Sequence, residues 1–325
     1  MRLFRRSTPP VTDSEGRAAP GSIASLTLTI LGGVPQGVLV RGRSPSNPAL
    51  LILHGGPGGA YIGEARSWFG FLENEWVVVN WDQRGAGLSH TRSVPPSSLT
   101  GAQLAEDAKE LVAVLRARFG VQRFILMAHS FGTVVAPHVL HALPDAFERY
   151  IAVGPTPTDI EAEMEAYRWT LARARELGRR RAVAQLERIG PPPYRSRFGG
   201  LDVRARWTNQ LGGAVPNGSG EDLAFRALRE GTENTWGDLF FRVLPGTRFW
   251  MRHLDESLSE ASASDFECPV PLPVVQGTLD RMSPPSATRR TFERWKAPSK
   301  RLLEIEGAGH YPFVDAPERF REALR

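Results

Sequence analysis

The residues with the clearest chemical potential are a serine, an aspartate and a histidine that each follow a strand-like segment. Ser130 lies in Ala128-His-Ser-Phe-Gly132, directly after the apolar run 124–127, and the residues two before and two after it are small. A serine on a sharp strand-to-helix turn exposes its hydroxyl, and the bend leaves no space for large flanking side chains. The pattern therefore predicts a nucleophile at Ser130.

A serine nucleophile needs a general base, and the base needs an acid that orients it. Seven histidines compete, and His310 is the best placed because it follows the last predicted strand in a glycine loop. Open α/β sheets place their sites at the carboxyl ends of strands. Asp280 also follows a predicted strand, and the order Ser130, Asp280, His310 is typical of this nucleophile turn. Asp159 is the competing acid.

A glycine-rich loop, His54-Gly-Gly-Pro-Gly-Gly59, follows the apolar run 49–53. Glycine loops also cradle phosphates, but no Gly-Lys-Ser/Thr follows here, and G-x-G-x-x-G spacing fails because Tyr61 takes the sixth position. The loop fits better as a source of backbone N–H donors for a developing oxyanion, with Gly56 and Phe131 as the two donors. This chemistry is acyl transfer, and it requires neither a metal nor an organic cofactor.

Strand-like and helix-like segments alternate along the parts of the chain that carry these residues. Short apolar runs between glycine loops are typical of strands buried on both faces of a parallel sheet. Apolar residues recur at helical spacing over 104–119, and 132–143 is a second apolar helix. The alternation predicts an α/β fold with a mostly parallel central sheet and helices on both faces. The expected strands are 26–30, 37–40, 49–53, 76–80, 124–127, 150–153, 272–275 and 301–305.

The alternation stops at residues 155–266, which are helical and rich in aromatic side chains. We predict an inserted helical cap there, between core segments 23–154 and 267–325. Residues 1–22 are rich in Pro, Ser and Gly, which predicts a flexible tail. Aromatic side chains in a cap either shape an apolar substrate pocket or bury the cap against the core. The tryptophans concerned are Trp169, Trp207, Trp236 and Trp250.

The composition narrows the classes of partner. The 325 residues carry a net charge of +5, but the densest basic run, 179–181, lies among glutamates, which indicates a solvated helix face rather than a nucleic-acid site. No apolar run approaches the ~20 residues of a membrane helix. Cys268 is the single cysteine, so no internal disulfide forms. We expect a cytoplasmic enzyme that acts on a small molecule or short peptide, without nucleic-acid or membrane partners, and we predict no particular oligomeric state.

Several motifs taken together resemble one family. His54-Gly-Gly-Pro-Gly-Gly59, Trp81-Asp-Gln-Arg-Gly-Ala-Gly-Leu-Ser89, the His-Ser-x-Gly turn and the contexts of Asp280 and His310 are similar to those of the proline iminopeptidase family of α/β-hydrolases. The resemblance runs from about residue 25 to the end of the chain and is weakest in the predicted cap.

The resemblance implies an α/β-hydrolase fold and a serine hydrolase mechanism. It implies structural support behind the site from Asp82-Gln-Arg84, where a buried ion pair could hold the loop. The site residues that it implies are Ser130 as nucleophile, Asp280 and His310 as its partners, and Gly56 and Phe131 as oxyanion donors.

The substrate class is less closely defined. Family aminopeptidases hold the free amine of the substrate with cap glutamates in a Trp-x-x-Trp-Glu context, and this sequence lacks that context. Glu230 and Glu233 are candidate replacements, with Trp236 as a candidate substrate contact. Two activities follow: an aminopeptidase that releases N-terminal residues from small peptides or amides, or a carboxylesterase, lactonase or amidase that needs no free amine. A non-hydrolytic member of the fold is the third possibility.

Overall fold

The structure, a computed structural model, describes residues 6–12, 15–195, 197–216, 218–253 and 266–325. All the expected strands are present. They are β1 (Ile23–Leu31), β2 (Val34–Gly42), β3 (Ala49–Leu53), β4 (Val77–Trp81), β5 (Phe124–His129), β6 (Phe147–Val153), β7 (Leu272–Gly277) and β8 (Lys300–Ile305).

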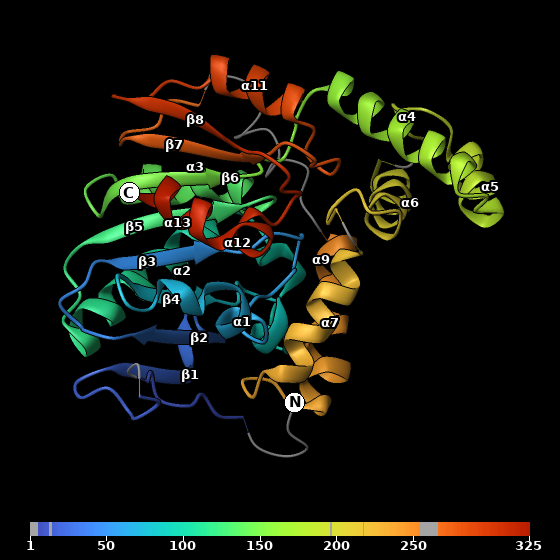
Figure 1. Ribbon diagram of the computed structural model, residues 1–325. Coiled ribbons are helices and arrows are strands. Elements are labelled where there is room, and N and C mark those ends of the chain that lie inside the picture. The colour runs from blue at the N-terminus through green and yellow to red at the C-terminus, as the bar shows by residue number, and fades with distance from the viewer. Residues whose placement is uncertain (1–5, 13–14, 196, 217, 254–265) are drawn as a thin grey trace.

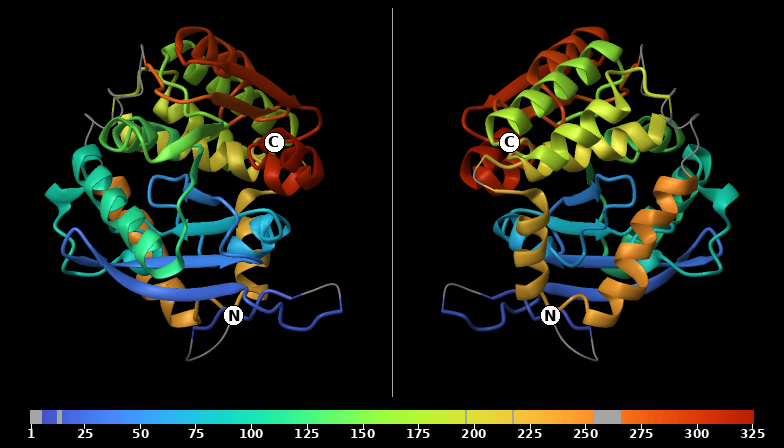
Figure 2. Two further views of the ribbon diagram at one scale, coloured as in Figure 1. Left: turned by 90° about the vertical axis from the view of Figure 1, so that its left-hand side faces the viewer. Right: turned by 90° about the vertical axis from the view of Figure 1, so that its right-hand side faces the viewer.

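These strands form one sheet in the order β1-β2-β4-β3-β5-β6-β7-β8. The β1–β2 and β2–β4 pairs are antiparallel, and the other pairs are parallel. Figure 2 shows the first strands at one end of the molecule and the last two strands at the other. The predicted α/β fold with a mostly parallel sheet is confirmed.

The central strands are buried on both faces, as their continuous apolar runs predict. Successive side chains of a strand point to opposite faces. In β3, Leu51 and Leu53 pack in one hydrophobic cluster, whereas Leu50 and Ile52 pack in another. The edge strand β1 differs, because Ile30 faces solvent with 63% of its surface exposed.

Helices cover both faces of the sheet. One face packs against α2 (Gly101–Phe119), α3 (Gly132–Ala142) and α11 (Pro285–Arg294), and the other against α1 (Ala65–Phe69), α12 (Pro312–Asp315) and α13 (Pro317–Leu324). Thr100 caps the start of α2 through its side chain, and Gly120, with a φ of 68°, ends it. Short 3-10 turns are η1 (Gly70–Leu72), η2 (Gly87–Ser89) and η3 (Pro96–Ser98).

Between β6 and β7 the described residues form helices and no regular strand; we call residues 155–253 the helical segment. It lies beyond the edge of the sheet where the parallel strands end (Figure 1). Its elements are α4 (Ile160–Glu176), α5 (Arg180–Ile189), α6 (Arg197–Gln210), α7 (Gly220–Glu230), α8 (Trp236–Asp238), the π-helix η4 (Leu239–Val243) and α9 (Leu244–His253). Residues 254–265 of the predicted cap lie outside the described residues, and a separate cap domain stays a prediction.

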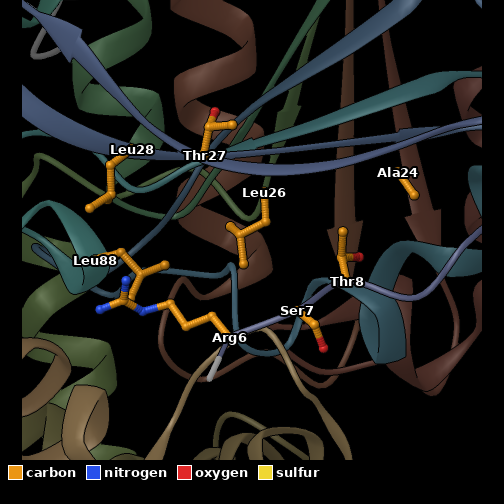
Figure 3. Close-up of a pocket in the computed structure, with 8 residues that line it drawn as sticks. All are labelled: Arg6, Ser7, Thr8, Ala24, Leu26, Thr27, Leu28 and Leu88. Carbon is orange, nitrogen blue, oxygen red and sulfur yellow. The ribbon is translucent and has the colours of Figure 1, made fainter. Parts of the chain in front are cut away.

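Part of the expected tail at 1–22 is bonded to the helical segment. The Ser7 N–H donates to the carbonyl of Thr232 at 3.0 Å, and Arg6 forms an ion pair with Asp238 at 2.5 Å. A pocket of about 340 Å³ lies between residues 6–8 of this tail, β1 and Leu88 (Figure 3). In the sheet, β1 is the edge strand and is separated by other strands from β5, β7 and β8, which precede the candidate catalytic residues. Its lining residues are Arg6, Ser7, Thr8, Ala24, Leu26, Thr27, Leu28 and Leu88. In the part of the chain that the structure describes, no helix is long and apolar enough to cross a membrane.

Candidate active site

The turn between β5 and α3 holds Ser130 in a strained backbone conformation. Its φ is 51°, in the left-handed region that residues other than glycine rarely adopt. Its N–H donates to the carbonyl of Val153 at 2.9 Å, and its own carbonyl accepts the N–H of Thr133 at 2.9 Å. A Cβ on Gly132 would lie 2.4 Å from the carbonyl oxygen of Leu53. The predicted strained turn, with no space for a side chain two residues after the serine, is confirmed.

His310 and Asp280 form a buried pair at the carboxyl ends of β8 and β7. Nδ1 of His310 lies 2.7 Å from Oδ2 of Asp280. The other carboxylate oxygen accepts the backbone N–H groups of Met282 at 2.8 Å and Ser283 at 2.9 Å, which hold the carboxylate in one orientation. Because a carboxylate can only accept, His310 donates through Nδ1, and Nε2 is the nitrogen that can take up a proton.

The end of β6 brings this pair close to the serine. Ser130 is bonded to the last residue of β6, and Gly154 follows with a φ of 51°. A Cβ on Gly154 would lie 3.2 Å from Nδ1 of His310 and 3.4 Å from Oδ2 of Asp280. The ring of His129, next to the serine, lies 4.7 Å from the His310 ring between centroids. Among the described residues no hydrogen bond involves Ser130 Oγ or His310 Nε2, so both are available to a substrate.

The competing acid, Asp159, is engaged elsewhere. Its Oδ1 accepts the N–H of Ala162 at 2.7 Å and so caps the start of α4. Arg290 of α11 donates to the same oxygen at 2.9 Å. The acid that is bonded to His310 is Asp280, and this arrangement favours it over Asp159.

The loop after β3 runs beside the serine and carries Gly56. A Cβ on Gly55 would lie 3.0 Å from Cβ of Ser130. The Gly55 carbonyl accepts the N–H of Gly59 at 3.0 Å within the loop. The Gly55 carbonyl and the Gly56 N–H belong to the same trans peptide and point in opposite directions. The Gly56 N–H therefore faces away from that turn. Phe131 directly precedes α3, where the first amides of a helix have no acceptor within the helix. Both predicted oxyanion donors therefore lie next to Ser130.

His54 and Asp82 hold this loop against the neighbouring one. Nδ1 of His54 donates to the carbonyl of Gly55 at 2.8 Å, and Nε2 accepts the N–H of Gln83 at 3.1 Å. Burial lowers the pKa of His54 to about 4, so the ring is neutral near pH 7. Asp82 accepts three backbone N–H groups at 2.9 to 3.3 Å, and burial raises its pKa to about 7. Both side chains act as structural supports.

Arg84 supplies the buried ion pair expected behind the site. Its Nη2 lies 2.7 Å from Oδ1 of Asp107 in α2, and its Nε donates to Oδ2 of the same carboxylate at 2.8 Å. Both side chains are buried. Two parallel charge-assisted hydrogen bonds of this kind restrict geometry as well as adding energy. The expected support is confirmed, and its partner belongs to α2.

The predicted substrate-binding residues lie in different surroundings within the helical segment. Glu230 is exposed at the end of α7. Glu233 is fully buried, and its carboxylate accepts from Nε of Arg66 in α1 at 2.7 Å. Trp236 is partly buried and stacks on the exposed ring of Phe240, with 6.4 Å between centroids. Within the described ranges, no hydrogen bond or ring contact joins these three residues to Ser130, so their role in binding stays a prediction.

Trp250 is the tryptophan of the predicted cap that reaches the site. It is fully buried, and its Nε1 donates to the carbonyl of Arg84 at 2.9 Å. Its ring packs edge-on against Phe131, 5.9 Å between centroids, and lies 2.8 Å from where a Cβ on Gly58 would be. Helix α9 therefore covers both the glycine loop and the residue after the nucleophile. Local spacing could not single out Trp250, because its position depends on how the whole helical segment folds.

A second pocket, of about 560 Å³, lies between α4 and α11. Its charged side chains are partly paired with each other and with neighbours: Arg290 bonds Asp159, and Glu165 accepts a hydrogen bond from Ser286. The lining residues are Ile160, Glu161, Met164, Glu165, Arg168 and Arg290. Over the described ranges, no group of three or more His, Cys, Asp or Glu side chains is placed to hold a metal ion.

Comparisons with known proteins agree with the fold. The alpha/beta hydrolase family model matches residues 50–323. A probable aminopeptidase of Bacillus subtilis (strain 168) is 30% identical over 309 residues, 93% of this chain and 96% of the relative. The crystal structure of a proline iminopeptidase-related protein from Thermus thermophilus matches with a TM-score of 0.63 and 26% identity, covering 93% of this chain and 96% of that one.

A more distant solved structure shares the fold. It is a 2-hydroxy-6-oxo-6-phenylhexa-2,4-dienoate hydrolase from a Rhodococcus species, with a TM-score of 0.57 and 17% identity over 93% of this chain and 97% of that one. The family match spans both the nucleophile turn and the His310 loop. The chain therefore belongs to the α/β-hydrolase family, where it resembles the proline iminopeptidase-like members, and it is a hydrolase.

Proposed function

We propose that Ser130, His310 and Asp280 form the catalytic triad of a serine hydrolase. The observation that carries this proposal is the buried 2.7 Å contact between His310 and Asp280, beside a serine held at a φ of 51°. A nucleophile, a base and an orienting acid are the parts that this chemistry needs. The backbone N–H groups that hold the carboxylate keep the pair ready before a substrate arrives.

In the first half of the reaction, His310 Nε2 takes the proton of Ser130 Oγ while that oxygen attacks the carbonyl carbon of an ester or amide. The carbonyl oxygen becomes an oxyanion, which the amides of Gly56 and Phe131 stabilise; one such donor is worth about 3–4 kcal/mol. The tetrahedral intermediate then breaks its bond to the leaving group, which takes the proton from His310. The acyl group remains on the serine as an ester.

In the second half, water attacks this ester and gives a proton to His310 Nε2. A second tetrahedral intermediate collapses, the carboxylic acid leaves, and Ser130 Oγ recovers its proton from His310. Asp280 keeps the hydrogen of His310 on Nδ1 and stabilises the imidazolium in both halves.

For the substrate, we propose small peptides or amides from which an N-terminal residue is released. The support comes from the relatives, one described as a probable aminopeptidase and one as proline iminopeptidase-related. These two cover nearly the whole chain, including the helical segment. Substrate selection by the helical segment follows from its position over the glycine loop, through Trp250.

A carboxylesterase, lactonase or amidase without a free-amine requirement is the second candidate. The observation in its favour is that Glu233 is bonded to Arg66 and Glu230 is exposed at the end of α7. The carboxylate of Glu233 is thus engaged by an arginine, which favours an activity that needs no receptor for a substrate amine. The apolar ring of Trp250 against Phe131 fits an apolar acyl group equally well.

Turnover of three kinds of substrate separates these activities: prolyl and alanyl p-nitroanilides, their N-acetylated forms, and p-nitrophenyl butyrate. Anilide cleavage that needs the free amine supports the aminopeptidase, and ester cleavage alone supports the esterase. In either case we expect Ser130→Ala to lower kcat on the order of 10⁶-fold. Activity that persists in Ser130→Ala contradicts the serine mechanism.

A further inference from the structure

We propose that His129 and Tyr61 are positioning residues that hold the backbone of His310 through a chain of two hydrogen bonds. Oη of Tyr61 lies 2.5 Å from Nδ1 of His129, and Nε2 of His129 lies 2.7 Å from the carbonyl oxygen of His310. All three residues are buried. The inference rests on the proposed function, because it takes His310 as the general base.

The chemistry of the partners sets the direction of both hydrogen bonds. The His310 carbonyl can only accept, so Nε2 of His129 carries a hydrogen. Burial lowers the pKa of His129 well below its ordinary value, so the ring is neutral and Nδ1 is an acceptor. Burial also raises the pKa of Tyr61 well above its ordinary value, so the phenol keeps its proton and donates it to Nδ1. The chain therefore has one arrangement of hydrogens.

The two bonds join three segments that come from distant parts of the sequence. Tyr61 belongs to the loop after β3 that carries the predicted oxyanion donor, His129 is the last residue of β5, and His310 follows β8. A Cβ on Gly55 would lie 2.8 Å from Oη of Tyr61 and 3.3 Å from Nδ1 of His129. This hydrogen-bonded chain is thus packed against the loop that carries Gly56, and it links that loop to the end of β5 and to the loop after β8.

The backbone of His310 is held on both sides. Its N–H donates to the carbonyl of Ala214 at 2.7 Å, and its carbonyl accepts from His129. Asp280 holds the ring through Nδ1, which leaves Nε2 as the ring nitrogen without a hydrogen bond to a described residue. Asp280 sets the orientation of the ring, whereas the backbone contacts set the point from which the ring extends. A displacement of about 1 Å costs about 10²-fold in rate, so loss of the His129 contact acts on the chemical step.

Two substitutions at position 129 form a matched pair. The amide nitrogen of Gln reaches about as far as Nε2 of histidine, so His129→Gln keeps a donor for the His310 carbonyl. The amide of Asn ends near Nδ1, so His129→Asn keeps a partner for Tyr61 and loses that donor. Both variants place a neutral polar side chain at the same buried position. A difference between them therefore reports on the bond to His310.

The measurement is the rate at which a fluorophosphonate probe labels Ser130, which needs no knowledge of the natural substrate. We expect His129→Asn to lower the maximal labelling rate by about 10²-fold with an unchanged half-saturating probe concentration. His129→Gln is expected to stay within about tenfold of the original protein. If His129→Asn does not fold, Tyr61→Phe is the second test, with an expected loss of about tenfold.

Equal labelling by His129→Asn and the original protein overturns the inference. So does an equal loss in His129→Gln and His129→Asn that follows a common loss of thermal stability. Labelling that persists in Ser130→Ala, or no labelling of the original protein, contradicts the proposed function and with it this inference. The two failures are distinguishable, because only the second involves the original protein or the serine variant.

Discussion

Two buried regions of this molecule contain a histidine and an aspartate and use them differently. In the first region, both ring nitrogens of His54 form hydrogen bonds with backbone groups, and the carboxylate of Asp82 accepts three backbone N–H groups. In the second region, one carboxylate oxygen of Asp280 accepts backbone N–H groups, and the other accepts from His310. Of these two histidines, only His310 keeps a ring nitrogen with no hydrogen bond to a described residue.

The difference shows that burial and residue type do not by themselves make a general base. A ring nitrogen can accept the proton of a serine only if no other donor already occupies it. His129 lies directly beside Ser130, yet both of its nitrogens are bonded, one to Tyr61 and one to His310. The first region, with His54, thus serves as scaffold, and the second as the candidate catalytic centre.

The largest effect that would test this contrast is on catalysis, at Asp280. In Asp280→Asn, the amide oxygen can keep the two backbone N–H groups, but the amide nitrogen then faces Nδ1 of His310 and favours the wrong tautomer. We expect kcat for p-nitrophenyl butyrate to fall by about 10⁴-fold. Steady-state kinetics, with circular dichroism to establish folding, measures this effect.

The matched control is Asp159→Asn, since asparagine caps a helix as well as aspartate does. We expect its kcat to remain within about threefold of the original protein, because Asp159 bonds Ala162 and Arg290 and, among the described residues, has no hydrogen bond or ion pair with the candidate catalytic side chains. Near-normal activity in Asp280→Asn together with a large loss in Asp159→Asn would reverse the assignment of the acid.

The next effect is on stability, at Asp82. Asparagine at this position replaces one acceptor oxygen by an NH2 group, which then faces backbone N–H groups. A buried donor without a partner lowers the stability by about 1–3 kcal/mol. We expect Asp82→Asn to lower the free energy of unfolding by about 3 kcal/mol, with kcat of the folded enzyme within about tenfold. Urea unfolding and kinetics on the same preparation measure both quantities. A loss of kcat as large as that of Asp280→Asn, with unchanged stability, would give this carboxylate a direct catalytic role.

The sequence predicted the second region better than the first because local spacing defines it. Ser130, Asp280 and His310 each follow a strand, and parallel strands end at one edge of a sheet. The strand ranges came from apolar runs, although β1 and β2 extend beyond them because cross-strand hydrogen bonds, not apolar side chains, decide where a hairpin ends. The roles of His54 and His129 depend on contacts between loops, which no local pattern contains.

The helical segment was predicted least well for the same reason. Glu233 bonds to Arg66, 167 residues away, and Arg6 bonds to Asp238, 232 residues away. Charged residues occur throughout this segment, so their types alone could not identify the partners. Glu233, which is a candidate on sequence grounds to bind a substrate amine, joins α1 to the helical segment in the structure.

The smallest effect is on the pH dependence of stability, at His54. Its pKa is about 4 in the folded protein because of burial and near 6.5 in the unfolded chain. Between these values the unfolded chain binds more protons, so the contribution of His54 to stability is complete above pH 6.5 and is lost as the pH falls towards 4. Between pH 7 and pH 5 this loss is about 2 kcal/mol.

His54→Gln removes the titrating ring. Between pH 7 and pH 5 we therefore expect the free energy of unfolding of this variant to fall by about 2 kcal/mol less than that of the original protein. The lost contacts of the ring lower the stability of the variant at every pH, and for that reason the two pH-dependent changes are compared rather than the absolute values. Asp82, with its pKa raised to about 7, shifts stability in the opposite direction, but it is present in both proteins and cancels. Urea unfolding at pH 7, 6 and 5 gives the comparison. Equal pH dependence in both proteins would mean that His54 can take up a proton without breaking its backbone bonds, and the scaffold role assigned to the first region would fail.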